Sequence, residues 1–266
     1  MTSYFRHKKK FGQNFLKDQQ IIERIIRLIN PKSGEAFVEI GPGLGALTQK
    51  LLPILETLTV IEIDDEAIEA LENSCRDLGK LTVIHQDVLT VDFAKVLDPV
   101  RIRVVGNLPY NISTPILFHL IKALGRVIDM TVMLQKEVVD RMVAAPGSKV
   151  YGRLSVMLQY HCKVEFLLHV PPGAFDPPPK VNSAIVHLVP HKEKPASAQN
   201  EALLSRVVQQ AFGQRRKTLK NSLKELIKDI NHEKITIDLS LRPEQLSVTD
   251  FVVLTNDIEK GNYDGR

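Results

Sequence analysis

Four consecutive residues, Asn107, Leu108, Pro109 and Tyr110, combine an amide, a proline and an aromatic ring directly after an apolar run at 102–105. Pro109 ends the strand that this run predicts, because proline fixes φ and lacks the N–H that a strand needs. The main-chain carbonyls of Leu108 and Pro109 then lose their ladder partners and can face a cleft. Together with the Asn107 oxygen and the Tyr110 ring, they suit the exocyclic amine of a planar base. A turn around a packed core tyrosine explains the loop equally well.

A glycine-rich loop, Gly41-Pro42-Gly43-Leu44-Gly45, lies between an apolar run at 36–40 and a helical pattern. This order is typical of the ligand-binding corner of a doubly wound α/β sheet, because glycines let the main chain approach a ligand and the helix offers free N–H groups. With Ala46 as its last position the loop satisfies the dinucleotide fingerprint. With Gly45 it gives the tighter repeat of enzymes that bind nucleoside-linked methyl donors. The loop alone does not choose between these two ligands.

Two acidic residues follow the next two predicted strands, at 58–63 and 81–85. Glu62 lies about 20 positions after the first glycine, which is the spacing of a carboxylate that binds ribose hydroxyls. It can also be a helix-start acid, although Asp64 already fills that role. Asp87 can accept the amine of an adenine or can cap a turn. Since the carboxyl ends of parallel strands meet at one edge, we expect these side chains and the Asn107 loop to share one crevice.

The remaining sequence predicts a second, helical domain. A strand at 183–189 returns antiparallel, and a polar linker at 191–200 separates an α/β domain at 1–190 from a helical domain at 191–266. Cations between 215 and 228 and apolar residues between 219 and 230 would lie on opposite faces of one helix, which favours docking onto nucleic acid over a merely solvated face. Before it, Phe175 lies in a proline-rich loop, where its ring can stack on a base or plug the core with equal weight.

The composition bounds the class of protein. The chain has 266 residues, 44% hydrophobic content, a formal net charge of +4 and two cysteines. The cysteines form no Cys-x-x-Cys pair, so a reduced cytoplasmic protein without a metal site is the simplest interpretation. The sequence has no apolar run that approaches the roughly 20 residues of a membrane span. The basic N-terminus lacks the apolar core of a secretory signal.

These motifs, taken in order, resemble the rRNA adenine N6-dimethyltransferases. The matching segments are Gln13-Asn14-Phe15-Leu16, the stretch from Glu39 to Gly45, Val60 to Asp64, Gln86-Asp87, Gly106 to Ser113, and Phe175 to Val181. Two C-terminal segments, Phe212 to Leu219 and Arg242 to Leu246, look like the bacterial small-subunit enzymes rather than their macrolide-resistance relatives on the large subunit. The fold implied is a Rossmann-like, mostly parallel sheet with an antiparallel last strand and a small all-helical C-terminal domain.

The resemblance implies S-adenosylmethionine as the methyl donor and no metal. It implies two adjacent adenosines as acceptors, in the 3′-terminal hairpin of small-subunit (16S) rRNA within an immature 30S-type particle, and a monomeric cytoplasmic enzyme. Carried over by position, Asn14 and Leu16 would close over the cofactor. Gly41 and Gly43 would contact its amino-acid part, Glu62 its ribose and Asp87 its adenine.

The same carry-over assigns the catalytic and RNA-binding residues. Asn107, which also belongs to the cofactor set, and a carbonyl of Leu108 or Pro109 would hold the adenine N6, with Tyr110 stacked on the base. The predicted RNA-binding residues are Phe175, Lys180, Arg215, Arg216, Lys217 and Lys220. Basic residues at 6–10 would add phosphate contacts.

Three other functions compete with this interpretation. An NAD-dependent oxidoreductase explains the glycine loop and Glu62 but leaves the Asn107 loop without a role. A DNA adenine methyltransferase shares the chemistry but more often carries aspartate at the position of Asn107. A ribosome assembly factor that docks without turnover shares the basic surfaces.

Overall fold

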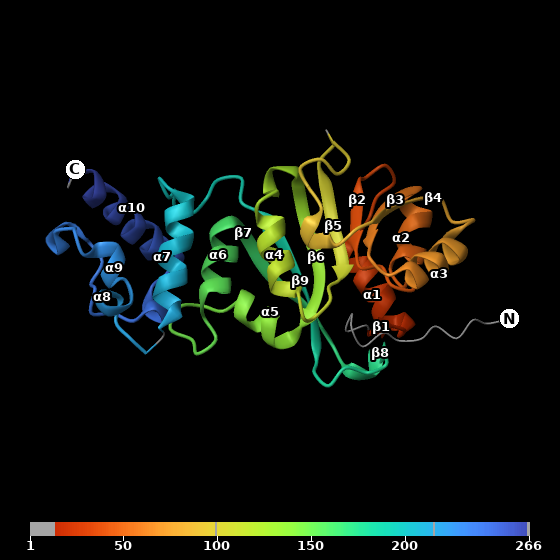
Figure 1. Cartoon of the computed structure of the whole chain (residues 1–266). Helices are drawn as coiled ribbons and strands as arrows, with labels where there is room; N and C mark the ends of the chain where they lie inside the picture. The colour runs from red at the N-terminus through yellow and green to blue at the C-terminus, as the bar shows by residue number, and fades with distance from the viewer. Residues whose placement is uncertain (1–13, 99, 215, 265–266) are drawn as a thin grey trace. The chain divides into compact units, whose positions relative to one another are not determined.

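The structure, a computed structural model, describes residues 14–98, 100–214 and 216–264. The predicted RNA contact Arg215 and the basic residues at 6–10 therefore lie outside the described residues. The chain divides into two compact units (Figure 1). One comprises residues 1–139 and Glu165–Pro190, and the other comprises Asp140–Val164 and His191–Arg266. The first contains the predicted crevice.

A seven-stranded sheet with the strand order β4-β3-β2-β5-β6-β9-β7 forms the centre of the first unit. Its strands are β2 (Phe37–Ile40), β3 (Thr57–Glu62), β4 (Lys80–His85), β5 (Ile102–Asn107), β6 (Val127–Gln135), β7 (Cys162–Val170) and β9 (Ser183–Pro190). The pairs among β2 to β6 are parallel, and β9 pairs antiparallel with β6. This confirms the predicted Rossmann-like sheet with its antiparallel strand.

Helices precede, connect and follow the parallel strands of the sheet. They are α1 (Gln19–Ile29), α2 (Thr48–Leu55), α3 (Asp65–Cys75), α4 (Ser113–Ile121) and α5 (Lys136–Met142), with short 3-10 turns η2 (Val88–Thr90), η3 (Leu124–Arg126) and η4 (Pro172–Ala174). Helix α1 begins at the cap Asp18, whose side chain accepts the Ile21 N–H at 3.1 Å. Ile22, Ile25 and Ile29 recur at helical spacing and are at most 2% exposed, so this face of α1 packs into the core.

Strands β2 and β5 approach each other closely where the loop of Asn107 to Tyr110 begins. Gly106, with φ of +156°, precedes Asn107 at the end of β5. A Cβ at this position would lie 2.3 Å from the main-chain oxygen of Ile40, so a residue with a side chain cannot occupy it without moving one of the strands. The glycine thus fixes where Asn107 emerges beside the glycine loop.

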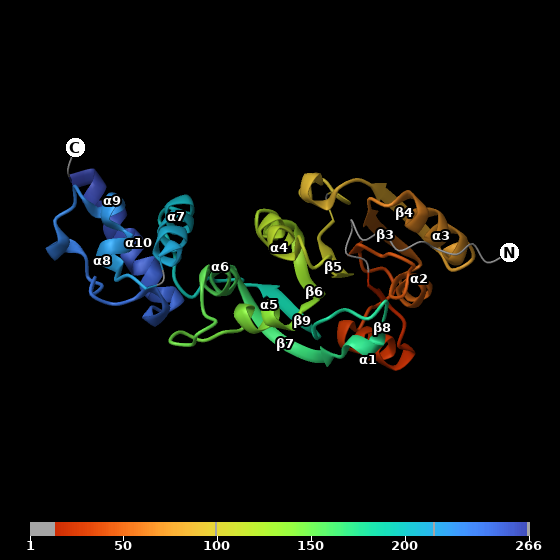
Figure 2. The ribbon, with the colours of Figure 1, turned by 60° about the horizontal axis from the view of Figure 1, so that its bottom comes forward.

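A second, two-stranded sheet was not predicted. Strand β1 (Phe15–Leu16) pairs antiparallel with β8 (Phe175–Asp176), with Phe15 opposite Asp176 and Leu16 opposite Phe175. The Lys17 N–H extends this pairing to the Ala174 carbonyl at 2.8 Å. Figure 1 and Figure 2 both place β8 beside α1. The N-terminal segment is thereby attached to the proline-rich loop.

The second unit is helical apart from a few strand residues. It contains α6 (Arg153–His161), α7 (Glu201–Gly213), α8 (Leu219–Ser222), α9 (Lys224–Ile227), η5 (His232–Lys234), η6 (Pro243–Gln245) and α10 (Val248–Asp264). Phe212 of α7 contacts Tyr151 and Phe251, with ring centroids 6.1 and 5.6 Å apart. The sequence predicts one helix for the leucines from 219 onward, whereas the structure has the two short helices α8 and α9.

Candidate active site

A cavity of about 610 Å³ lies at the carboxyl ends of β2, β3 and β5, where the sequence predicts a crevice. Most of the predicted cofactor and catalytic residues line it. They are Asn14, Leu16, Gly41, Gly43, Glu62, Asn107, Leu108, Pro109 and Tyr110. Three segments distant in sequence therefore meet around one space: the β1 segment, the glycine loop and the loop after β5.

The glycine loop is held in place from both sides. Gly43 has a left-handed φ of +54°, and a Cβ there would lie 2.8 Å from the Phe15 ring, so β1 packs directly on the loop. The Glu62 carboxylate at the end of β3 accepts the Gly43 N–H at 3.3 Å. It also accepts the main-chain N–H groups of Ile63 and Asp64, at 2.8 and 3.1 Å. Glu62 thus presents an ordered carboxylate to the cavity.

The Asn107 amide is oriented by the N-terminal segment. Its Nδ2 donates to the main-chain carbonyl of Asn14 at 3.1 Å. A carbonyl can only accept, so the amide must present its NH₂ group to Asn14 and its oxygen elsewhere. That oxygen, Oδ1, is buried and has no hydrogen-bond partner among the described residues. A buried acceptor without a partner costs about 1–3 kcal/mol, so it marks a place where a ligand N–H is expected.

The two candidate carbonyls of the loop differ in their bonding. The Pro109 carbonyl accepts the Ile112 N–H at 3.2 Å in the turn that leads into α4. No hydrogen bond to the Leu108 carbonyl occurs among the described residues, while the Leu108 N–H is bonded to Met133 of β6 at 3.1 Å. The sequence left the choice between these carbonyls open, and the geometry favours Leu108.

Tyr110 is anchored at its hydroxyl. The phenol oxygen lies 2.5 Å from Oγ of Ser183, the first residue of β9. Burial raises the pKa of Tyr110, and the Ser183 bond opposes this in part, so the phenol stays neutral at physiological pH. Ser183 itself has no exposed surface. Sequence reasoning did not connect the two residues, because they are far apart in the chain and no local pattern joins them.

A second residue that sequence reasoning missed is Glu39. It lines the cavity from β2, is 2% exposed and accepts the Thr48 hydroxyl at 2.7 Å. Burial raises the pKa of Glu39 to about 7; the Thr48 bond lowers it and the charge of Glu62 raises it further. A carboxylate inside an apolar strand directly before a glycine loop is costly to bury, and that is the signal that could have identified it.

Two predicted residues lie elsewhere. Asp87 caps η2, accepting the Leu89 N–H at 2.9 Å, and is not among the cavity-lining residues. Phe175 is 1% exposed and belongs to the core cluster with Leu16 and Ile22. Of the two predicted roles, the structure supports packing in the core, because in the strand paired with β1 the Phe175 ring faces inward. The prediction that Phe175 stacks on a base is corrected accordingly.

The other predicted RNA contacts among the described residues are on the surface. Lys180 is exposed in the proline-rich loop, and Arg216, Lys217 and Lys220 are exposed in the helical unit. Among the described residues there is no group of three or more His, Cys, Asp or Glu side chains that could hold a metal ion. The described helices include none that is both long and apolar enough to cross a membrane.

Comparison with known proteins gives a consistent result. Residues 4–260 match the family described as ribosomal RNA adenine dimethylase. The chain is 51% identical over 261 residues to a Pseudomonas putida protein named ribosomal RNA small subunit methyltransferase A, covering 97% of this chain and 98% of that protein. It is 54% identical over 249 residues to the protein of the same name from Methylobacillus flagellatus, covering 94% and 96%.

A solved structure agrees with these relatives. The crystal structure of a dimethyladenosine transferase from Plasmodium falciparum superposes with a TM-score of 0.80 at 28% identity, covering 93% of this chain and 98% of that one. The chain belongs to the ribosomal RNA adenine dimethylase family, whose members are S-adenosylmethionine-dependent methyltransferases that dimethylate adenines in ribosomal RNA.

Proposed function

We propose that this enzyme dimethylates N6 of two adjacent adenosines in the 3′-terminal hairpin of small-subunit rRNA, within an immature 30S-type particle in the cytoplasm. The observation that carries the proposal is the buried Asn107 oxygen without a partner, set beside the free Leu108 carbonyl. Two acceptors that line the same cavity as the glycine loop fit an amine that is to be methylated. The names of the relatives support the small subunit as the target.

The cavity fits S-adenosylmethionine, which supplies a methyl group on a positively charged sulfur. We propose that Gly41 and Gly43 hold its amino-acid part and that the Glu62 carboxylate binds its ribose hydroxyls. Asn14 and Leu16, which line the same cavity from the β1 segment, would cover it. Asp87 remains the predicted partner of its adenine amine, through the carboxylate oxygen that does not cap η2.

The adenine N6 is a weak nucleophile because its lone pair is delocalised into the ring. In the proposed step N6 attacks the methyl carbon, the carbon–sulfur bond breaks with its electron pair on sulfur, and an N6 proton passes to water. Asn107 Oδ1 and the Leu108 carbonyl accept the N6 hydrogens, fix the lone pair in line with the methyl group and stabilise the positive charge that develops on nitrogen. No general base is required for this chemistry.

The target adenosine must leave its stack to reach the cavity, and we propose that Tyr110 then stacks on it. Lys180, Arg216, Lys217 and Lys220, with Arg215 outside the described residues, would bind phosphates. Phosphate contacts release counterions, so binding of the particle should weaken steeply as salt rises. A flat salt dependence would place the docking surface elsewhere. We further propose that the enzyme acts as a monomer.

The deciding experiment is methyl transfer from labelled S-adenosylmethionine to unmethylated small-subunit particles, with large-subunit particles and DNA as controls. The products are digested to nucleosides and identified by mass. Dimethyladenosine from the small subunit alone supports the proposal. Label on the large subunit or on DNA would overturn the target, and a protein that binds both the donor and the particle without transfer would be a docking factor.

A further inference from the structure

Tyr110 and Ser183 both belong to segments that are hydrogen-bonded to the end of strand β6. The Leu108 N–H, two residues before Tyr110, donates to the Met133 carbonyl of β6 at 3.1 Å. Ser183 lies opposite Gln135, the last residue of β6, in the antiparallel ladder. The two hydroxyls are 2.5 Å apart, so this side-chain bond joins two segments that are each already attached to β6 through the main chain.

This bond attaches the Tyr110 ring at both ends. The Cβ atom fixes one end of the ring to the loop, and Ser183, without exposed surface, fixes the other end to β9. A ring held only at Cβ can swing about the first side-chain torsion, χ1, whereas a ring held at both ends keeps its long axis in one position. A wall of the cavity that is already in place loses less entropy when a base stacks on it.

The need for this fixed ring changes during dimethylation. An unmodified adenine N6 carries two hydrogens, one for Asn107 Oδ1 and one for the Leu108 carbonyl. After the first methyl transfer N6 carries only one hydrogen, so one of the two acceptors no longer helps to hold the amine. The alignment of N6 for the second transfer then depends more on the stacking surface than the alignment for the first.

We propose that Ser183 is a positioning residue that, by locking the Tyr110 ring, promotes the second methyl transfer to each adenosine more than the first. This inference rests on the proposed function of the same site. In the second step the monomethylated N6 attacks a new methyl carbon, the carbon–sulfur bond breaks with its electrons on sulfur, and the last N6 proton passes to water. Ser183 takes no part in these bond changes.

The test compares three variants on unmethylated small-subunit particles: Ser183→Ala, Tyr110→Phe and both together. Loss of one neutral hydrogen bond corresponds to an effect of up to roughly tenfold, so we expect the second transfer to slow by about that factor and the first by less. N6-monomethyladenosine should accumulate among the products. Because both changes remove the same bond, the double variant should be no slower than either single variant. If Ser183→Ala does not fold, Tyr110→Phe removes the same bond without changing β9.

Ser155→Ala is the matched control. Ser155 is also without exposed surface, and its hydroxyl donates to the Arg141 carbonyl in the helical unit. Its loss should lower the unfolding temperature as a buried hydrogen bond does and leave the ratio of mono- to dimethyladenosine unchanged. The affinity for S-adenosylmethionine, measured by calorimetry, should be the same in all these proteins.

A second readout needs no turnover. The chain has five tyrosines, so spectra of ¹³C-tyrosine-labelled protein are simple, and the Tyr110 signal is identified by its loss in Tyr110→Phe. Ser183→Ala should let the long axis of the ring reorient, which ¹³C relaxation of the Tyr110 signal measures. An unchanged Tyr110 signal, or a wild-type product ratio in Ser183→Ala, would overturn the inference. Absence of dimethyladenosine with the wild-type enzyme would instead overturn the proposed function.

Discussion

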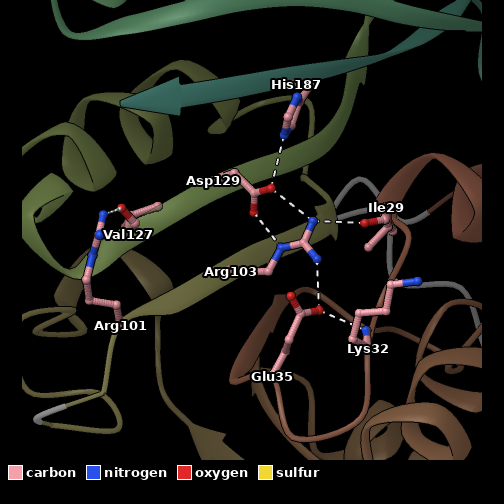
Figure 3. Close-up of polar contacts among 8 residues, drawn as sticks. All are labelled: Ile29, Lys32, Glu35, Arg101, Arg103, Val127, Asp129 and His187. Atoms are coloured by element: carbon pink, nitrogen blue, oxygen red, sulfur yellow. Dashed lines mark hydrogen bonds and ion pairs between the residues drawn. The ribbon is translucent and has the colours of Figure 1, made fainter. Parts of the chain in front are cut away.

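The two ends of strand β5 differ in how completely their polar atoms are bonded. At its start, Arg103 donates from Nε and Nη2 to the two carboxylate oxygens of Asp129, each at 2.9 Å. Its other bonds run to Glu35 at 3.0 Å and to the Ile29 carbonyl at 2.8 Å, as Figure 3 shows. At the end of the same strand, the buried oxygen of Asn107 has no partner among the described residues.

This difference separates residues that hold the sheet together from residues that bind a ligand. Arg103 lies over the Phe37 ring at 4.8 Å and joins β2, β5 and β6 to the end of α1, and His187 of β9 adds a bond to Asp129 at 3.1 Å. A largely buried guanidinium that has a partner at each of its three nitrogens is stable but offers little to a ligand. A buried acceptor left open costs stability in the free protein and is available when a ligand arrives.

The largest expected effect is on stability at the Arg103 end. Arg103→Met leaves the Asp129 carboxylate buried without its main partner, so the free energy of unfolding should fall by about 3–5 kcal/mol. Urea unfolding measures this as a lower midpoint. The residual folded enzyme should transfer methyl groups at the wild-type rate, because no atom of the cavity changes.

Arg101→Met is the matched control at the same edge. Arg101 is exposed and donates to the Val127 carbonyl at 2.8 Å, also seen in Figure 3. Its replacement should cost no more than about 1 kcal/mol, as for an ordinary exposed bond. An equal loss in both variants would mean that the network of Arg103 contributes nothing beyond one hydrogen bond.

The opposite result is expected at the Asn107 end. Asn107→Ala removes an acceptor that stabilises charge in the transition state, so methyl transfer should fall by roughly 100- to 1000-fold. Loss of the unpaired oxygen should cost no stability, and loss of the Nδ2 bond to the Asn14 carbonyl should cost about 1 kcal/mol. The affinity for S-adenosylmethionine should change little. Single-turnover assays and calorimetry measure the two effects separately. Near-normal turnover would refute the assigned role, and Asn73→Ala on α3 serves as a surface control.

Two buried carboxyl groups extend the comparison to pH. Asp129 lies beside the start of β5. Burial there favours the neutral form of the Asp129 carboxyl, but the bonds from His187 and Arg103 prevail and lower its pKa below 3.8. Beside the cavity, burial prevails and raises the pKa of Glu39 from 4.5 to about 7. The first group contributes stability above pH 3.8 that is lost as pH falls further. The second contributes stability at pH 4.5 that is lost as pH rises to about 7.

The corresponding variants should flatten different parts of the stability curve. Glu39→Gln should remove a decline on the order of 3 kcal/mol between pH 4.5 and 7, and Asp129→Asn should remove acid sensitivity below pH 4. Urea midpoints across this range, read against wild type, measure both. A wild-type decline that persists in Glu39→Gln would show that another group titrates there.

Local sequence was sufficient wherever short segments decide the outcome. The glycine loop, the strand that ends at Asn107 and the antiparallel β9 follow from apolar periodicity and from the positions of glycine and proline. The single helix predicted after 219 was wrong because periodicity cannot show the break at Leu223, whose ψ of 8° departs from helical values. Phe175 fitted two roles locally, and only the tertiary packing that buries its ring distinguishes a core residue from a base contact.

The features that sequence reasoning missed are contacts between distant segments. The pairing of β1 with β8 and the bond between Tyr110 and Ser183 each depend on residues that no local pattern connects. The Asn107 amide shows the same limit. Its residue type was predictive of an acceptor, but the direction of its oxygen is set by the Asn14 carbonyl.

The smallest expected effect lies at the rim of the Arg103 network. The Glu35 side chain is 34% exposed, and its Oε2 accepts both Arg103 Nη1 and the Lys32 N–H. Glu35→Gln keeps an acceptor for these donors and removes only the charge, which water and salt already screen, so it should cost less than about 1 kcal/mol. The cost should shrink further at 1 M salt, where charges are screened within about 3 Å. A loss as large as that of Arg103→Met, unaffected by salt in urea unfolding, would instead make Glu35 the main counter-ion of Arg103 and Asp129 a secondary partner.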